Sequence, residues 1–265
     1  MAVDLIVPLK EPSRGKSRLR DGLGCPVSDH RHAELVLAFA FDTLRAATAT
    51  PGVRRVLVVS SVPAALTALR ELGVDVVGEH ADDTGDIGND SDSDDDGDDS
   101  DGSDSDDGAP SGRNGAGNGA AGPVGTTDGA DAANTGLNAA LRTGERVLRA
   151  TDPGCVIGAL QADLPALRPD ELAAALAAAD GRRAFTADRH GSGTTLLLSA
   201  PGQRLDPHFG PGSARAHALS GALPLSAPLP SLRTDVDTPG DLEHARLLGL
   251  GERTRTVLDR VCLPS

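Results

Sequence analysis

The sequence predicts an α/β fold in which helices cover both faces of a mostly parallel sheet. Short apolar runs alternate with longer segments of helical character, and the runs are apolar at every position rather than at every second one. Strands of this kind are typical of a buried parallel sheet, because a sheet face in water would need polar residues. The 265 residues fit one large α/β domain or two small ones.

The first half of the chain follows the pattern β-α-β-α-β. Asp29 is an expected cap of a long helix, Pro63 lies where a first helical turn begins, and Gly73 is a natural stop. We therefore expect strands over 4–9, 55–60 and 74–77 and helices over 30–48 and 63–72.

The second half resumes the alternation after an interruption. Pro169 stands in the first turn of an Ala/Leu-rich helix, and Gly181 follows its end. We expect helices over 137–150, 169–179, 213–219 and 239–248, and strands over 155–160, 183–187, 194–199 and 232–236.

The interruption is a low-complexity segment at about 82–133, first Asp/Ser/Gly-rich and then Gly/Ala/Asn-rich. With almost nothing apolar to bury, it is expected to be disordered. Asp92 to Gly97 matches the start of a calcium loop, but the twelfth position is Ser103 instead of Glu. The sequence therefore favours a single domain, residues 1–265, with a solvated insertion in a surface loop.

The net charge of −14 comes from this insertion, because residues 82–108 contain fourteen Asp and no Lys or Arg. The remainder is balanced, and aromatic residues make up only 2% of the chain. A nucleic-acid partner is therefore not expected. The three cysteines are far apart, which indicates neither a zinc site nor disulfides. Without a leader or a membrane-spanning run, we expect a cytoplasmic protein with no membrane association.

Acidic residues follow two predicted strands. Asp163 follows the strand over 155–160, and Asp235 and Asp237 lie at the end of the strand over 232–236. Ligands of open α/β sheets bind beyond the carboxyl ends of strands, and carboxylates there suit Mg²⁺ together with phosphate oxygens. Equally, Asp237 could cap the following helix and Asp163 could open a turn.

A basic loop follows the first strand and contains Lys10, Lys16 and Arg18. Gly15, Lys16 and Ser17 match the end of a P-loop, but Lys10 occupies the position of its first glycine, so that motif fails. The cations still suit a triphosphate at the ligand edge of the sheet. The alternative is an ordinary exposed basic loop.

Two glycine-rich segments, 191–195 and 208–215, could cradle a phosphate or carboxylate, since glycine permits close backbone approach. They could also be two ordinary turns. The histidines show no metal-ligand spacing, and we expect five of them to lie at the surface: His30, His32, His190, His217 and His244.

The segments QADLPAL, FTADRHGSGTTLLL, HFGPGSARAH and LRTDVDTPGDLEHARLLGLG together resemble the 2-phospho-L-lactate or phosphoenolpyruvate guanylyltransferases of coenzyme F-420 biosynthesis. The resemblance begins at DLIVPLKEPSRGKSRL and covers nearly the whole chain. It implies a three-layer nucleotidyltransferase domain like that of sugar-nucleotide pyrophosphorylases, with GTP and Mg²⁺. The composition resembles the actinobacterial branch, whose acceptor is phosphoenolpyruvate, rather than the archaeal branch, which uses 2-phospho-L-lactate.

The resemblance also implies roles for individual residues. It assigns the acceptor to Thr195, Gly210 and Ser213, the metal to Asp163, Asp235 and Asp237, and the nucleotide to Lys10, Lys16, Arg18 and Asn138, with Asp163 and Lys16 as the catalytic pair. The chain departs from the family in the long acidic insertion and in Ala162, where glycine is common.

The resulting hypothesis is that the acceptor phosphate attacks the α-phosphorus of GTP and pyrophosphate leaves. Positioning and charge neutralisation then account for catalysis, because a phosphate oxygen is already a nucleophile. A 2-phospho-L-lactate acceptor, a molybdopterin-type nucleotidyltransferase and a non-catalytic nucleotide-binding relative are the alternatives. A homodimer is possible.

Overall fold

The computed structural model describes residues 2–10, 18–19, 28–61, 69–79 and 128–261. Its elements belong to one compact unit formed by Met1–Ala81 and Asp128–Ser265. Most of the predicted insertion, Lys16 and the start of the helix expected over 63–72 lie outside the described residues.

A seven-stranded sheet runs through this unit in the order β3-β2-β1-β4-β6-β5-β7. Its strands are β1 (Val3–Leu9), β2 (Val53–Ser60), β3 (Asp75–Gly78), β4 (Val156–Leu160), β5 (Ala184–Ala187), β6 (Thr194–Leu198) and β7 (Leu223–Pro224). β6 runs antiparallel to β4 and β5, and the other pairings are parallel. The expected mostly parallel sheet is confirmed.

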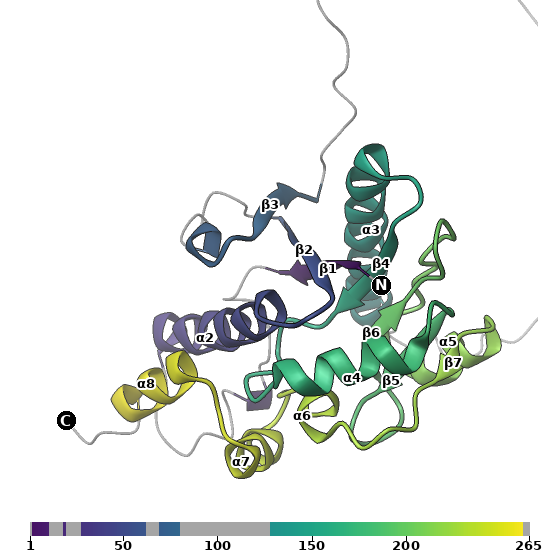
Figure 1. The fold of residues 1–265 in the computed structure, drawn as a ribbon. Helices are drawn as coiled ribbons and strands as arrows, with labels where there is room; N and C mark the ends of the chain where they lie inside the picture. The colour runs from purple at the N-terminus through teal and green to yellow at the C-terminus, as the bar shows by residue number, and fades with distance from the viewer. Residues whose placement is uncertain (1, 11–17, 20–27, 62–68, 80–127, 262–265) are drawn as a thin grey trace, which may run out of the picture. The chain divides into compact units, whose positions relative to one another are not determined.

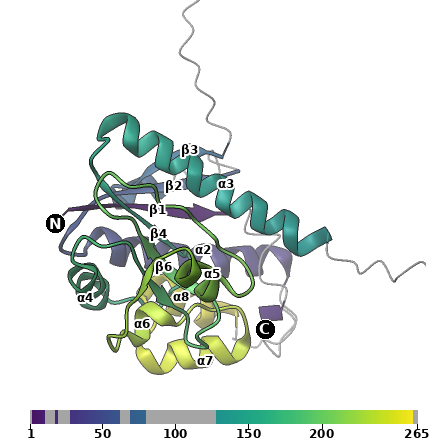
Figure 2. The ribbon, with the colours of Figure 1, turned by 90° about the vertical axis from the view of Figure 1, so that its right-hand side faces the viewer.

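Helices cover both faces of the sheet and make three layers (Figures 1 and 2). One face packs against α2 (Asp29–Thr48) and α4 (Pro169–Ala179), and the other against α3 (Asp128–Thr151) and α5 (Ser213–Leu219). Two further helices, α7 (Pro239–Leu248) and α8 (Glu252–Val261), pack with α2 around Phe39.

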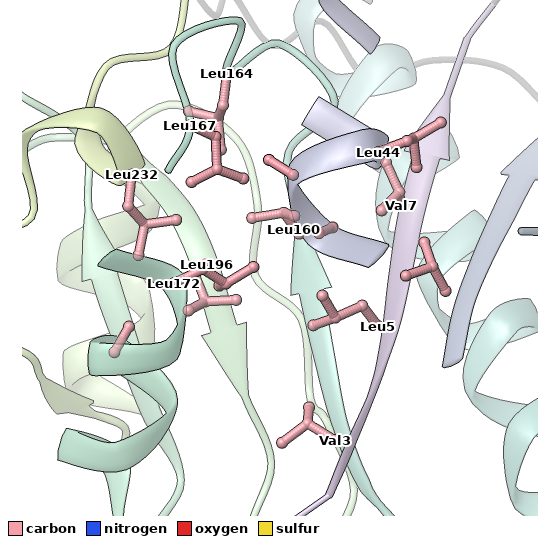
Figure 3. Close-up of a cluster of buried hydrophobic side chains, with 14 of the residues drawn as sticks. Val3, Leu5, Val7, Leu44, Leu160, Leu164, Leu167, Leu172, Leu196 and Leu232 are labelled. Carbon is pink, nitrogen blue, oxygen red and sulfur yellow. The ribbon is translucent and has the colours of Figure 1, made fainter. Parts of the chain in front are cut away.

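The two faces of β1 explain why the predicted strands are apolar throughout. Leu5 and Val7 belong to the cluster under α2 and α4, which Figure 3 shows in close-up, whereas Ile6 belongs to the cluster under α3. Successive side chains of a strand point to opposite faces, so a strand between two helical layers needs apolar residues at every position.

The strand predicted over 232–236 is wrong. This region begins with the short helix α6 (Pro230–Arg233) and continues as a segment outside the sheet. The side chain of Glu171 accepts hydrogen bonds from the N–H groups of Ser231 and Leu232, at 2.8 and 3.4 Å, and so stabilises the start of α6. A short segment with apolar residues only at its two ends, Leu232 and Val236, does not reveal which partner its backbone will find.

Several element boundaries also differ from expectation. α3 begins at Asp128, nine residues before the expected start at 137, and the cap of α2 is Ser28 rather than Asp29. β7 and α8 were not expected. α8 carries few apolar residues, chiefly Val257 and Leu258, so its apolar content alone does not reveal a helix.

Candidate active site

The turn after β4 brings Asp163 beside the second acidic segment. The carbonyl of Asp163 accepts a hydrogen bond from the N–H of Val236 at 3.1 Å, so the backbone of Asp163 lies beside the residue that separates Asp235 from Asp237. The buried hydroxyl of Thr43 on α2 braces this turn, since it accepts from the N–H of Leu164 at 3.0 Å. Residues far apart in the sequence therefore meet after β4, although the segment with Asp235 and Asp237 is not the strand that the sequence predicts.

The second acidic segment is fixed by Asp241 of α7. Its carboxylate accepts from the N–H of Thr238 at 2.9 Å and the N–H of Asp237 at 3.3 Å, and Arg189 donates to it at 2.7 Å. Burial would raise the pKa of Asp241, but these donors and the Thr238 hydroxyl lower it below its usual value. The cap of α7 is Thr238, so the interpretation of Asp237 as a cap is wrong.

The three aspartates supply the donor chemistry that Mg²⁺ prefers. Asp163 and Asp235 are half-buried, and Asp237 is exposed. Within the part of the chain that the structure describes, no three His, Cys, Asp or Glu side chains are gathered closely enough to hold a metal ion by themselves. Mg²⁺ commonly takes one or two carboxylates together with phosphate oxygens and water, and its binding to these aspartates stays a prediction.

Lys10 lies at the same edge of the sheet as Asp163. Lys10 directly follows β1, which runs parallel to β4, so Lys10 and Asp163 leave the sheet at the same edge. Lys10 and Arg18 are exposed, and Lys16 is outside the described residues. Their contact with a triphosphate stays a prediction.

The loop between β5 and β6 is organised by Asp188. This buried carboxylate accepts from the N–H groups of Ser192 and Gly193, at 2.9 and 2.8 Å. A Cβ atom on Gly193 would lie 2.6 Å from the Asp188 carboxylate, so this glycine is needed for close approach. The loop is therefore more than an ordinary turn: a buried charge holds its backbone.

The second glycine-rich segment packs against this loop. The N–H of Ala214 donates to the carbonyl of Ser192 at 3.1 Å, and Ser213 Oγ lies 3.2 Å from Thr194 Oγ1. Gly210 has a φ of 140°, which side-chain-bearing residues rarely adopt. Gly210, Ser213 and Thr194 thus form one polar corner between β6 and α5.

Thr195 lies differently from the other two predicted acceptor residues. Leu196 pairs with Thr186 and Thr194 pairs with Ala187, so Thr195 is the extra residue of a β-bulge. Its fully buried hydroxyl lies 3.4 Å from the carbonyl of Thr186. The structure groups Thr194 with Ser213, and a role for Thr195 stays a prediction.

Asn138 of α3 holds the acceptor segment through its side chain. Its amide nitrogen donates to the carbonyl of Phe209 and its amide oxygen accepts from the N–H of Phe209, both at 3.0 Å. The amide is nearly buried. Asn138 therefore has a defined structural partner next to Gly210, and its predicted contact with the nucleotide is untested.

The expectation of surface histidines is wrong for His32 and His217, which are 2% and 0% exposed. His217 and Thr194 were not among the predicted site residues, although both lie beside Ser213 through the Thr194 hydroxyl. One signal was available: Ser213 and His217 are four residues apart in a predicted helix, and such residues share a face.

None of the described helices has the length and apolar character that crossing a membrane requires.

The chain is similar to named enzymes over nearly its full length. The phosphoenolpyruvate guanylyltransferase of Streptomyces scabiei is 40% identical over 262 residues, covering 98% of this chain and 97% of that protein. The enzyme of the same name from Streptomyces coelicolor is 41% identical over 261 residues, with the same coverage. No protein-family model matches the chain.

The fold has a solved counterpart in a Desulfovibrio desulfuricans protein assigned as a nucleotide-diphospho-sugar transferase. The two structures agree with a TM-score of 0.58 over 98% of this chain and 95% of that one, at 14% identity. This likeness shows that the two proteins share the fold, a sheet between two layers of helices.

Proposed function

Because the chain belongs to the phosphoenolpyruvate guanylyltransferase family, we propose that it transfers the guanylyl group of GTP to phosphoenolpyruvate. The products are enolpyruvoyl-2-diphospho-5'-guanosine and pyrophosphate, as coenzyme F-420 biosynthesis requires. The structural observation that best supports this is the hydrogen bond between Asp163 and Val236, which joins two acidic segments at the ligand edge of the sheet.

In the proposed reaction an oxygen of the acceptor phosphate attacks the α-phosphorus of GTP. A new P–O bond forms, the bond between the α-phosphorus and the bridging oxygen breaks, and pyrophosphate leaves with that electron pair. No general base is needed for the nucleophile, since the phosphate is already anionic. The chain's task is to hold the two substrates in line and to offset their like charges.

Each part of the site has a task in this proposal. Lys10, Lys16 and Arg18 bind the triphosphate by charge, and Asn138 supports the nucleotide side. Thr195, Gly210 and Ser213 seat the acceptor, together with Thr194, which the structure adds. Asp163, Asp235 and Asp237 would hold Mg²⁺, which when bound neutralises charge on the phosphates. The proposal also places the enzyme in the cytoplasm and includes a homodimer.

The test is pyrophosphate release by the purified protein with Mg²⁺ and pairs of substrates. GTP with phosphoenolpyruvate should give the highest kcat/KM, whereas CTP in place of GTP should give little release. A higher kcat/KM with 2-phospho-L-lactate would move the acceptor to that acid. Binding of GTP without release for either acceptor would favour a non-catalytic relative. Since the acid-linked product is expected to be labile, the enzyme that consumes it should be present.

A further inference from the structure

A buried histidine next to the acceptor segment carries an inference that deepens the proposed function and rests on it, because it assumes that Gly210 and Ser213 seat the acceptor. His217 lies on α5 four residues after Ser213, so the two side chains share one face of the helix. The imidazole is fully buried, with ring centroids 5.0 Å from Phe209 and 5.9 Å from Phe185. Packing therefore fixes its position.

Hydrogen bonds fix which ring nitrogen carries the proton. The backbone N–H of His208 lies 3.0 Å from Nε2 of His217 and can only donate, so Nε2 accepts and carries no proton. The ring is therefore neutral with its proton on Nδ1. Nδ1 lies 2.9 Å from Thr194 Oγ1, so the imidazole donates to this hydroxyl.

The Nδ1–H group of His217 determines whether the Thr194–Ser213 pair keeps a hydroxyl proton that can be donated to a third group. The two hydroxyls are 3.2 Å apart and have two protons, of which one is used in the bond between them. Because the imidazole gives a proton to Thr194 and takes none, the second hydroxyl proton remains for another acceptor. With the opposite tautomer, Thr194 would donate to the ring and Ser213 to Thr194, and no proton would remain.

We propose that His217 is a positioning residue that, through Nδ1–H, makes the Thr194–Ser213 pair offer a hydroxyl proton to the phosphorylated acid. Phosphate and carboxylate oxygens only accept hydrogen bonds, so the seat needs a donor. Burial, with help from His208 and Arg183 and against Asp206, lowers the pKa of His217 to about 4. The imidazole thus keeps this neutral state at physiological pH.

Two substitutions separate the functions of the ring nitrogens. His217→Asn keeps an amide donor near the position of Nδ1, whereas His217→Gln brings an amide oxygen near Nε2 and loses that donor. We expect His217→Gln to raise the KM for phosphoenolpyruvate about tenfold, because the seat loses a hydrogen bond to a charged group. His217→Asn should stay within about threefold of the parent, and neither should change the KM for GTP.

A matched pair of threonine substitutions checks the same inference. Thr194→Val should raise the KM for phosphoenolpyruvate as His217→Gln does. Thr254→Val is the control, since this threonine is equally buried and its hydroxyl has no partner among the described residues. The proposal would be overturned if Thr194→Val and Thr254→Val raised the KM for phosphoenolpyruvate equally. It would also be overturned if Thr194→Val did not raise this KM.

A spectroscopic readout separates this proposal from the proposed function. The ¹⁵N shifts of His217 should report the neutral tautomer with the proton on Nδ1 at pH 6 to 7. A proton on Nε2 would overturn the inference even in an active enzyme. If the parent protein releases no pyrophosphate with any acceptor, the proposed function fails, while the tautomer still decides the polarity of the pair.

Discussion

At the scale of single residues, Asp163 is the carboxylate on which the proposed chemistry most depends. Asp163→Asn removes one charge and leaves the backbone bond to Val236 in place. We expect kcat to fall by about a hundredfold or more, with an unchanged melting temperature, because charge stabilisation in the site is lost. Steady-state kinetics and thermal unfolding give both values.

Asp180→Asn is the matched control for this substitution. Asp180 is exposed at the end of α4 with a φ of 48°, a conformation that asparagine also tolerates. Its turnover should equal that of the parent. An Asp163→Asn enzyme with a normal rate would remove Asp163 from the metal site.

Gly251 shows how closely a single residue packs far from the chemistry. A Cβ atom there would lie 2.2 Å from Cγ of Asp42, whose carboxylate accepts from the N–H groups of Arg253 and Thr254 at 3.1 and 2.7 Å. Gly251→Ala should therefore lower the free energy of unfolding by about 1–3 kcal/mol. The reason is that the new Cβ displaces the Asp42 carboxylate, which caps the first turn of α8.

Gly240→Ala is the comparison for that measurement in urea unfolding. In α7, the nearest heavy atom to a new Cβ is Thr238 Oγ1 at 3.7 Å, an ordinary contact. This variant should be neutral or slightly more stable, since alanine favours a helix. Equal stabilities for the two variants would show that Asp42 moves aside without cost.

At the scale of elements, the buried histidine of α5 gives the protein a pH dependence. The pKa of His217 is about 4 in the folded protein, below its ordinary value of 6.5, so the unfolded chain binds the extra proton between these pH values. Stability therefore falls as pH drops from 6.5 to 4 and is unaffected by this group at higher pH.

The measurement compares the free energy of unfolding of the parent with that of His217→Gln across this range. Relative to the variant, the parent should lose on the order of 2 kcal/mol between pH 7 and pH 4. Parallel curves would mean that His217 is as accessible to protons in the fold as in the unfolded chain.

Most elements could be predicted because local pattern decides them. The strands at 4–9 and 55–60, for example, are apolar on both sides whatever lies beside them, and they become β1 and β2. The reversed direction of β6 was not predicted, because strand direction depends on partners distant in sequence. The prediction of a strand at 232–236 was wrong for the same reason. This segment forms one backbone hydrogen bond, from Val236 to Asp163, rather than pairing with a strand.

The candidate site divides in a similar way. Three aspartates were expected after two strands at one sheet edge, and the structure shows one backbone bond, from Val236 to Asp163, between these segments. The grouping of Thr194 with Ser213 was not foreseen, because it follows from a bulge against β5. His217 was missed because burial of a lone histidine depends on the packing around α5.

At the scale of the whole molecule, we expect the folded unit not to need the acidic insertion. The carbonyl of Glu79 accepts from the hydroxyl of Thr143 at 3.1 Å, fifteen residues along α3 from Asp128. A helix rises 1.5 Å per residue, so a connection must span about 22 Å, which about twelve extended residues exceed. Replacing residues 82–127 by a Gly/Ser linker of that length is therefore feasible.

The deletion should leave stability equal or slightly higher, because a shorter loop costs less entropy to close. It should also leave kcat/KM for GTP unchanged or raise it at low salt, since fourteen Asp repel a triphosphate. Thermal unfolding and kinetics at two salt concentrations measure both effects. Loss of turnover in a folded deletion variant would instead give the insertion a part in the reaction.

The central claim of guanylyl transfer is tested most directly by the fate of the phosphates of GTP. The protein is incubated with Mg²⁺, phosphoenolpyruvate and GTP labelled at either the α- or the γ-phosphate, and the products are separated. The account predicts that the α-label enters a new diphosphate joined to the acid and that the γ-label leaves in pyrophosphate. A γ-label that leaves as inorganic phosphate, or an α-label that never joins the acid, would contradict it.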